Sequence, residues 1–123
     1  MKKILYSEKA PKPIGPYSQA VGLGNLIFTS GQIALDTQGN VVSADIKAQT
    51  KKVIENLKSI LEDSGSSLDN VIKTTVYLTD INEFVLMNEV YAEYFGKSMP
   101  ARSTAQVSKL PKDAKVMIDV ISY

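Results

Sequence analysis

Two segments of the chain carry the signals of a helix, and the first of them shows apolar residues at helical spacing. In residues 43–64 they lie three and four positions apart, and Gly65 follows as a helix terminator. The other face of this segment is charged, and we interpret it as solvated: Lys47, Lys51, Lys52, Glu55, Lys58 and Glu62. Asp80 and Glu83 resemble a capping box, which predicts a second helix over residues 81–95 with Gly96 at its end.

Runs of β-branched and alternating residues predict six strands. Residues 2–6 form a short first strand, and residues 18–29 form two strands around a turn at residues 22–25. The last three strands are predicted at residues 70–78, 101–107 and 114–122. A proline-rich, irregular loop precedes Tyr17, because proline lacks a backbone donor and restricts the residue before it.

The order β, β, β, α, β, α, β, β predicts an α+β fold in a single domain over residues 1–123. Two helices can cover only one face of a mixed sheet of about six strands. In the strand at residues 70–78 we expect Val71 and Thr75 on one face and Thr74 and Val76 on the other. Neither face of the later strands is purely polar, which favours a homo-oligomer built through the sheets.

Composition removes several classes of chemistry. Neither Cys nor His occurs among the 123 residues, so thiolate nucleophiles, imidazole bases and thiolate or imidazole zinc sites are excluded. Fourteen basic and 13 acidic residues give a net charge of +1, which argues against nucleic acid or a membrane surface as a partner. The apolar run in residues 1–13 is too short for the core of a signal peptide, and no run of about 18 apolar residues occurs elsewhere, so the expected location is the cytoplasm.

Arg102 is the single arginine among 14 basic residues. A guanidinium grips a carboxylate with two parallel hydrogen bonds, which a lysine ammonium does less specifically. Arg102 is therefore a candidate ligand-binding residue. The alternative is an arginine that pairs with an acidic side chain across a subunit interface.

Other candidates also have a structural alternative. Tyr17 either offers its hydroxyl to a pocket or packs at an interface. Gly31, after Ser30, either lets a ligand approach its backbone N–H or forms a bulge. Asn88 lies among apolar neighbours and is either part of a ligand site or a buried amide that forms hydrogen bonds with the backbone. Asp119, inside the last predicted strand, either pairs with the arginine or faces solvent at an edge.

Six segments combine into a recognisable pattern. They are residues 10–20, Thr29-Ser30-Gly31-Gln32, residues 71–76, Asn88-Glu89-Val90-Tyr91, Pro100-Ala101-Arg102-Ser103 and Leu110-Pro111-Lys112-Asp113. In this order and spacing they resemble the RidA/YjgF family of reactive-intermediate deaminases over essentially the whole chain. The resemblance implies a chorismate-mutase-like fold and a homotrimer with ligand sites between subunits. It also implies hydrolysis of enamines and imines, such as 2-aminoacrylate and 2-iminobutanoate, to 2-keto acids and ammonia without metal or organic cofactor.

The same resemblance assigns roles by position. Arg102 matches the family arginine that holds the substrate carboxylate, and Tyr17 matches the pocket tyrosine. The Ser30-Gly31 backbone matches the segment that contacts the ligand. Asn88 matches a helix residue at the site, and Thr104 occupies a pocket position that is often Cys in relatives.

The last strand departs from the family pattern. Many deaminases of the family have the sequence Val-Glu-Ile-Glu in this strand. The resemblance implies that the first glutamate positions or activates the attacking water. This chain has Met117 in the place of that glutamate. Asp119 matches the second glutamate and faces the same side about 6.5 to 7 Å away. A methionine cannot accept a proton, so we hypothesise a weakened or substrate-shifted imine deaminase.

Two alternatives to this deaminase stay open. The first is a trimer that binds a keto acid or amino acid in the carboxylate pocket without turnover, which the Met117 departure supports. The second is an RNA-directed translation inhibitor or a chaperone. The sequence offers no histidine pair and no basic stripe for RNA.

Overall fold

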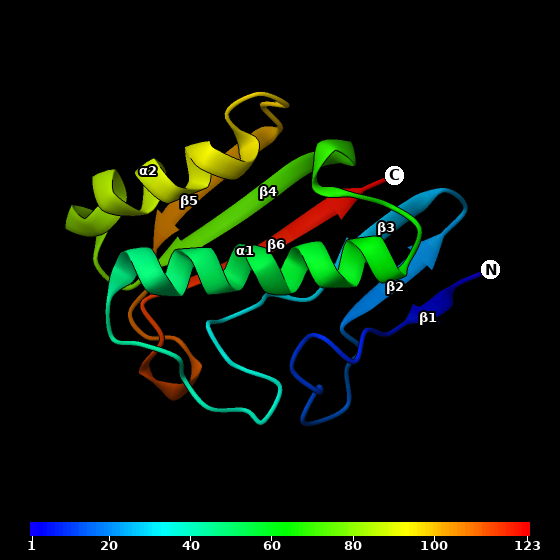
Figure 1. Ribbon diagram of the computed structural model, residues 1–123, viewed down its shortest axis with the longest axis horizontal. Helices are drawn as coiled ribbons and strands as arrows, with labels where there is room; N and C mark the ends of the chain where they lie inside the picture. Colours follow the sequence, from blue (N-terminus) through cyan, green and yellow to red (C-terminus); the bar gives the residue numbers. More distant parts are fainter.

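The computed structural model describes all residues 1–123 as a six-stranded sheet with two helices on one face (Figure 1). The elements are β1 (Lys3–Leu5), β2 (Ala20–Leu23), β3 (Leu26–Thr29), α1 (Ile46–Asp63), β4 (Val71–Leu78), α2 (Phe84–Phe95), β5 (Ala101–Gln106) and β6 (Val116–Ser122). The sheet order is β1-β2-β3-β6-β4-β5. Only β4 and β5 are parallel, because α2 crosses between them. The predicted α+β class and element order are confirmed.

The apolar face of α1 and the inner face of the sheet form the core. The periodic positions of α1 are buried as the spacing predicts, and the positive φ of 84° at Gly65 follows the end of the helix. Alternate residues of the two central strands meet this helix. The fully or almost fully buried side chains are Val53, Ile54, Leu57, Ile60, Leu61, Val76, Leu78, Val116, Ile118 and Val120.

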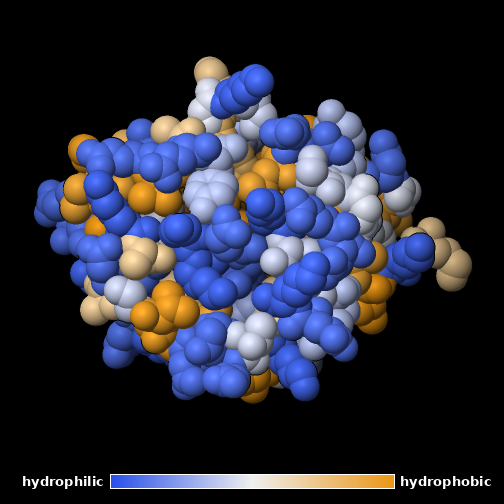
Figure 2. All heavy atoms as spheres, in the orientation of Figure 1, coloured by the Kyte–Doolittle hydropathy of each residue, from blue (hydrophilic) through white to orange (hydrophobic).

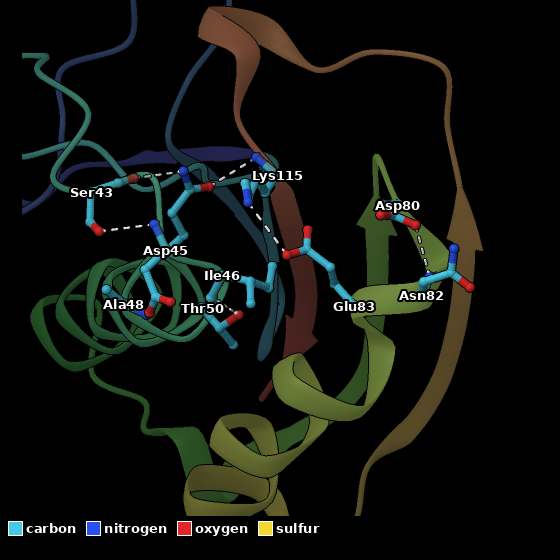
Figure 3. A network of polar contacts seen from close by, with 10 residues as sticks. Ser43, Asp45, Ile46, Ala48, Thr50, Asp80, Asn82, Glu83 and Lys115 are labelled. Carbon is cyan, nitrogen blue, oxygen red and sulfur yellow. Dashed lines mark hydrogen bonds and ion pairs between the residues drawn. The ribbon is translucent and has the colours of Figure 1, made fainter.

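Polar side chains fix the start of α1 (Figure 3). The carboxylate of Asp45 accepts a hydrogen bond from Ala48 N at 2.9 Å. Gln49 donates to Ser43 O at 2.7 Å and accepts from Lys115 N at 2.9 Å. The beginning of α1 is therefore joined to the chain just before β6.

The second helix starts later than the sequence predicts. Residues Ile81–Glu83 form a 3₁₀ turn, and α2 begins only at Phe84. Asp80 caps that turn by accepting from Asn82 N at 3.0 Å (Figure 3). The predicted reciprocal capping box is wrong, because the Glu83 carboxylate instead lies 3.4 Å from the Lys115 ammonium.

A bulge in β4 also corrects the predicted faces. The pairing of β4 with β6 shifts register between Val71 and Lys73, so the alternation is broken there. Val71 is consequently buried under the helices together with Thr74 and Val76, and Ile72 is exposed. Simple alternation had placed Val71 on the face of Thr75.

The sheet face away from the helices is only half covered within one chain. We call it the open face; its central residues, all half-buried, are Lys73, Thr75, Tyr77, Met117, Asp119 and Ile121. In contrast, the side that carries the helices is largely polar at its surface (Figure 2). Neither helix has the length and apolar character needed to cross a membrane.

Candidate functional site

A buried glutamine holds the proline-rich loop in place. The Gln19 side chain accepts from Ser7 N at 2.7 Å and donates to Pro11 O at 2.9 Å. The loop then turns at Gly15, whose φ is 123°, and the Tyr17 hydroxyl accepts a hydrogen bond from Ile14 N at 3.3 Å. Tyr17 is thus exposed but fixed at both its backbone and its hydroxyl.

A cavity of about 500 Å³ lies between this loop and the end of β3. Four of the predicted site residues line it, and we call the group the N-terminal cavity: Tyr17, Ser30, Gly31 and Met117. Its other walls are mostly prolines and aliphatic side chains, with Lys12 and Lys112 also on the lining. The Ser30 hydroxyl donates to Ser18 O at 2.6 Å, whereas the Gly31 N–H has no acceptor in the chain. Gly31 therefore brings a backbone N–H without an acceptor to the lining of this cavity.

Met117 and Gly31 pack closely inside the cavity. A Cβ atom on Gly31 would lie 2.6 Å from the Met117 Sδ atom and 2.8 Å from its Cγ atom. A larger residue at position 31 would therefore force the flexible Met117 side chain to move, although the backbone of Gly31 does not have a positive φ. The strand alternation of β6 places Met117 on the same side as Asp119, as predicted.

Arg102 lies at the opposite edge of the sheet, on β5. It is exposed, and its Nη1 atom donates to Asn88 Oδ1 on α2 at 2.6 Å. The guanidinium also stacks over two rings of α2, with Cζ 4.6 Å from the Tyr91 ring centroid and 5.2 Å from that of Phe84. No acidic side chain lies within 4.0 Å of it. Its positive charge is thus oriented by neutral groups and not neutralised within the chain.

Thr104 follows Arg102 on the same face of β5. Its Oγ1 atom is buried and has no hydrogen-bond partner. A buried hydroxyl without a partner is costly and calls for an explanation, such as a ligand or an ordered water. We call Asn88, Arg102 and Thr104 the arginine edge.

Asp119 does not pair with Arg102 within the chain, and it does not lie at an edge of the sheet as the second sequence-based alternative predicts. In the register of the sheet Arg102 pairs with Thr74 on the helix side, whereas Asp119 pairs with Thr75 on the open face. Its strand, β6, is central and not an edge. Burial raises the pKa of Asp119, while hydrogen bonding with Tyr77 and Thr75 and the charge of Lys73 act in the opposite direction.

One chain does not bring the predicted site residues together. The N-terminal cavity lies between the end of β3 and Met117 on β6, and the arginine edge lies on β5, with β4 between them. At the usual strand spacing β6 and β5 are about 10 Å apart, and Met117 lies on the open face whereas Arg102 lies on the helix side. A small carboxylic acid cannot reach both within one chain.

Two aromatic residues that contact Arg102, Phe84 and Tyr91, are not identified from the sequence. The sequence singles out Asn88 on this helix and assigns no role to the apolar neighbours around it. The unique arginine was the signal that could have assigned them, because a guanidinium stacks on aromatic faces.

Comparisons with known proteins agree over almost the whole length. The endoribonuclease L-PSP family matches residues 7–123. A RutC family protein of Pyrococcus abyssi is 58% identical, over 99% of this chain and 97% of the relative. TdcF of Escherichia coli, whose name places it among reactive intermediate deaminases, is 44% identical, over 99% and 97%.

Solved structures show the same fold. The structure of Escherichia coli TdcF with bound serine has a TM-score of 0.92 at 44% identity, covering 98% of this chain and 97% of that one. A Thermotoga maritima protein described as an endoribonuclease has a TM-score of 0.96 at 48% identity, over 99% and 97%. The chain therefore belongs to the endoribonuclease L-PSP family, which is the RidA/YjgF family that its motifs resemble, and it has that family's chorismate-mutase-like fold.

Proposed function

We propose that this chain hydrolyses reactive 2-imino acids and their enamine tautomers to 2-keto acids and ammonia. The observation that carries the proposal is the exposed Arg102 guanidinium, which is oriented by Asn88 and two aromatic rings but has no acidic partner. Such a group fits a ligand carboxylate. The similarity to TdcF, which is crystallised with the amino acid serine, supports a ligand of this class.

We further propose that the complete site lies between neighbouring copies of the chain, in a homotrimer. The separation of the N-terminal cavity from the arginine edge supports this arrangement, because each chain then contributes one half of a site and a neighbour the other. The half-covered open face supports an oligomer in the same way. In this proposal residues 1–123 act as one domain in the cytoplasm.

The reaction needs little beyond positioning. A protonated imine is already electrophilic, and water adds to its carbon to give a tetrahedral aminoalcohol. A proton then moves to nitrogen, the C–N bond breaks, and ammonia leaves as the ketone forms. In the proposed site Arg102 holds the carboxylate, while the free Gly31 N–H and the Tyr17 hydroxyl orient the attacking water.

Met117 weakens this activity or shifts its substrate in our proposal. The thioether packs on Gly31, where a carboxylate would otherwise orient or activate the water. Asp119 lies two residues further on the same face, among Tyr77, Thr75 and Lys73. The Asp119 side chain is shorter than a glutamate, and it can replace the missing carboxylate at position 117 only if it reaches the attacking water.

Binding without turnover is the second candidate function, and Met117 is the observation that favours it. A trimer with the same arginine edge would then hold a 2-keto acid or amino acid without changing it. The name of the family suggests RNA cleavage as a third activity, but the chain has no histidine and a net charge of +1, so we do not propose it.

The test generates imines from alanine, 2-aminobutanoate and leucine with an amino-acid oxidase and follows their decay. Wild type should accelerate the decay, and Arg102→Ala should lose the acceleration. If wild type leaves the decay at the buffer rate but Met117→Glu accelerates it, the protein is the binding module and not a deaminase.

A further inference from the structure

The Arg102 guanidinium is held by one face of α2. Its Cζ atom lies 4.6 Å from the centre of the Tyr91 ring, and its Nη1 atom donates to Asn88 Oδ1 at 2.6 Å. Phe84 forms a second, more distant wall at 5.2 Å. These three residues are spaced by four and three positions, so they form one stripe of the helix.

Tyr91 is itself locked in place. Only 7% of the residue is exposed, and its hydroxyl shares a buried hydrogen bond of 2.8 Å with Thr74 Oγ1 on β4. Phe95 packs against the same ring, with centroids 4.7 Å apart. Thr74 pairs with Arg102 in the register of β4 and β5. The ring that contacts the guanidinium is therefore tied to the strand beside it.

This arrangement orients a cation without neutralising it. A free arginine side chain has many rotamers, and ordering it on ligand binding costs affinity. An acidic partner would order it too, but would also compete with the ligand for its charge. A stacked ring attracts the guanidinium through its face and leaves the in-plane N–H groups free.

The geometry points to Tyr91 as a positioning residue for carboxylate binding: its ring, fixed by the hydrogen bond to Thr74, holds the Arg102 guanidinium in place. Tyr91 acts through Arg102 and needs no contact with the ligand. The inference rests on the proposed function only in that the ligand is a 2-keto or 2-imino carboxylate.

The experiment compares two tyrosines of the same helix. Tyr91→Leu removes the stacked ring, and Tyr94→Leu is the matched control, because the Tyr94 hydroxyl donates to Glu55 and the ring does not contact Arg102. Tyr91→Phe keeps the ring and loses the hydroxyl. The dissociation constant for 2-oxobutanoate is measured by calorimetry on the full chain, together with KM and kcat for 2-iminobutanoate.

Tyr91→Leu should raise the dissociation constant and KM roughly 5- to 30-fold, the range expected for a partly desolvated cation–π contact, with a smaller change in kcat. Tyr94→Leu should stay within about 2-fold of wild type, and Tyr91→Phe, which keeps the ring but loses the hydrogen bond to Thr74, should lie between Tyr94→Leu and Tyr91→Leu. If Tyr91→Leu does not fold, Tyr91→Met carries the same expectation, because its flexible side chain fills more of the buried space.

The result that overturns the inference is 2-oxobutanoate binding by Tyr91→Leu as tight as that of wild type, or an equal loss in Tyr94→Leu. A wild type that binds 2-oxobutanoate but turns over no imine, with Tyr91→Leu still weakened, sinks the proposed function and leaves the inference standing. If wild type turns over the imine but the KM of Tyr91→Leu is unchanged, the proposed function stands and the inference about Tyr91 is wrong.

Discussion

The arginine edge and the N-terminal cavity are built on opposite principles. At the arginine edge a charged group is held by neutral contacts from a helix, so that its charge stays available. In the N-terminal cavity a backbone N–H is left without a partner between a fixed loop and a thioether. The first region has the means to bind an anion, and the second has the means to place a small polar molecule such as water.

This difference predicts how variants should behave. Changes at the arginine edge should weaken binding of substrate and product alike, because the carboxylate is the same in both. Changes in the N-terminal cavity should lower turnover while leaving binding of the 2-keto acid largely intact.

Arg102→Ala should have the largest effect. Loss of two charge-assisted hydrogen bonds costs about 3 kcal/mol, which corresponds to a roughly 100-fold fall in kcat/KM and in affinity for 2-oxobutanoate. Arg102→Lys, which keeps the charge but not the planar fork, should recover only part of both. Imine decay and calorimetry check this, and unchanged 2-oxobutanoate affinity in Arg102→Ala would contradict the role of the arginine edge.

Gly31→Ala should have the next largest effect, because the new Cβ meets the Met117 Sδ atom at 2.6 Å. Because the flexible Met117 side chain borders a cavity and can move, the cost should be at the low end of the range for overpacking, about 1 kcal/mol in the free energy of unfolding. We expect a turnover loss of roughly 10-fold with 2-oxobutanoate affinity little changed.

A second change checks the cause of the Gly31→Ala effect. Met117→Ala should restore much of the lost stability and turnover when combined with Gly31→Ala, since it removes the clashing atoms. Urea denaturation and imine decay measure the two quantities. Purely additive losses in the double variant would show that the two side chains do not interact.

Met117→Glu should raise turnover by roughly 2- to 10-fold, because it places a carboxylate where water can be oriented. Binding of 2-oxobutanoate should not improve, since the arginine edge is unchanged. A tighter complex without faster imine decay would assign Met117 to ligand binding and not to turnover. Met117→Gln, with similar size and no charge, is the matched control.

Asp119→Asn should have the smallest effect, on stability. Burial raises the pKa of Asp119 above 3.8, so the folded state holds the proton more tightly than the unfolded chain. Its contribution to folding is present below pH 3.8 and is lost as the pH rises through the folded-state pKa. The stability of wild type relative to Asp119→Asn should therefore fall from about pH 3 to pH 7 in urea denaturation. A relative stability that rises over this range would contradict the assigned cause.

The sequence predicts the elements well because their signals are local. The periodic apolar face of α1 and the terminator Gly65 depend on neighbours only a few residues away. The errors arise where tertiary contacts decide. The Glu83 carboxylate pairs with Lys115 instead of capping the helix, and the bulge in β4 places Val71 on the helix side.

The candidate site was predicted as a set of residues but not as a geometry. The unique arginine and the family motifs identify Arg102, Tyr17 and Gly31, yet no local pattern shows on which face of the sheet each one lies. The position of Asp119 away from Arg102 depends on strand register, which is a long-range property. The separation of the two halves follows from sheet order and is visible only in three dimensions.

The most direct test of the central claim is subunit complementation. Arg102→Ala disrupts only the arginine edge, and Gly31→Val disrupts only the N-terminal cavity. The two variants are unfolded together and refolded as an equal mixture. If each site combines the arginine edge of one chain with the N-terminal cavity of its neighbour, about one quarter of the sites in random trimers are intact. The account predicts recovery of about one quarter of wild-type imine turnover, far above either parent. A mixture no more active than the average of its parents would contradict it.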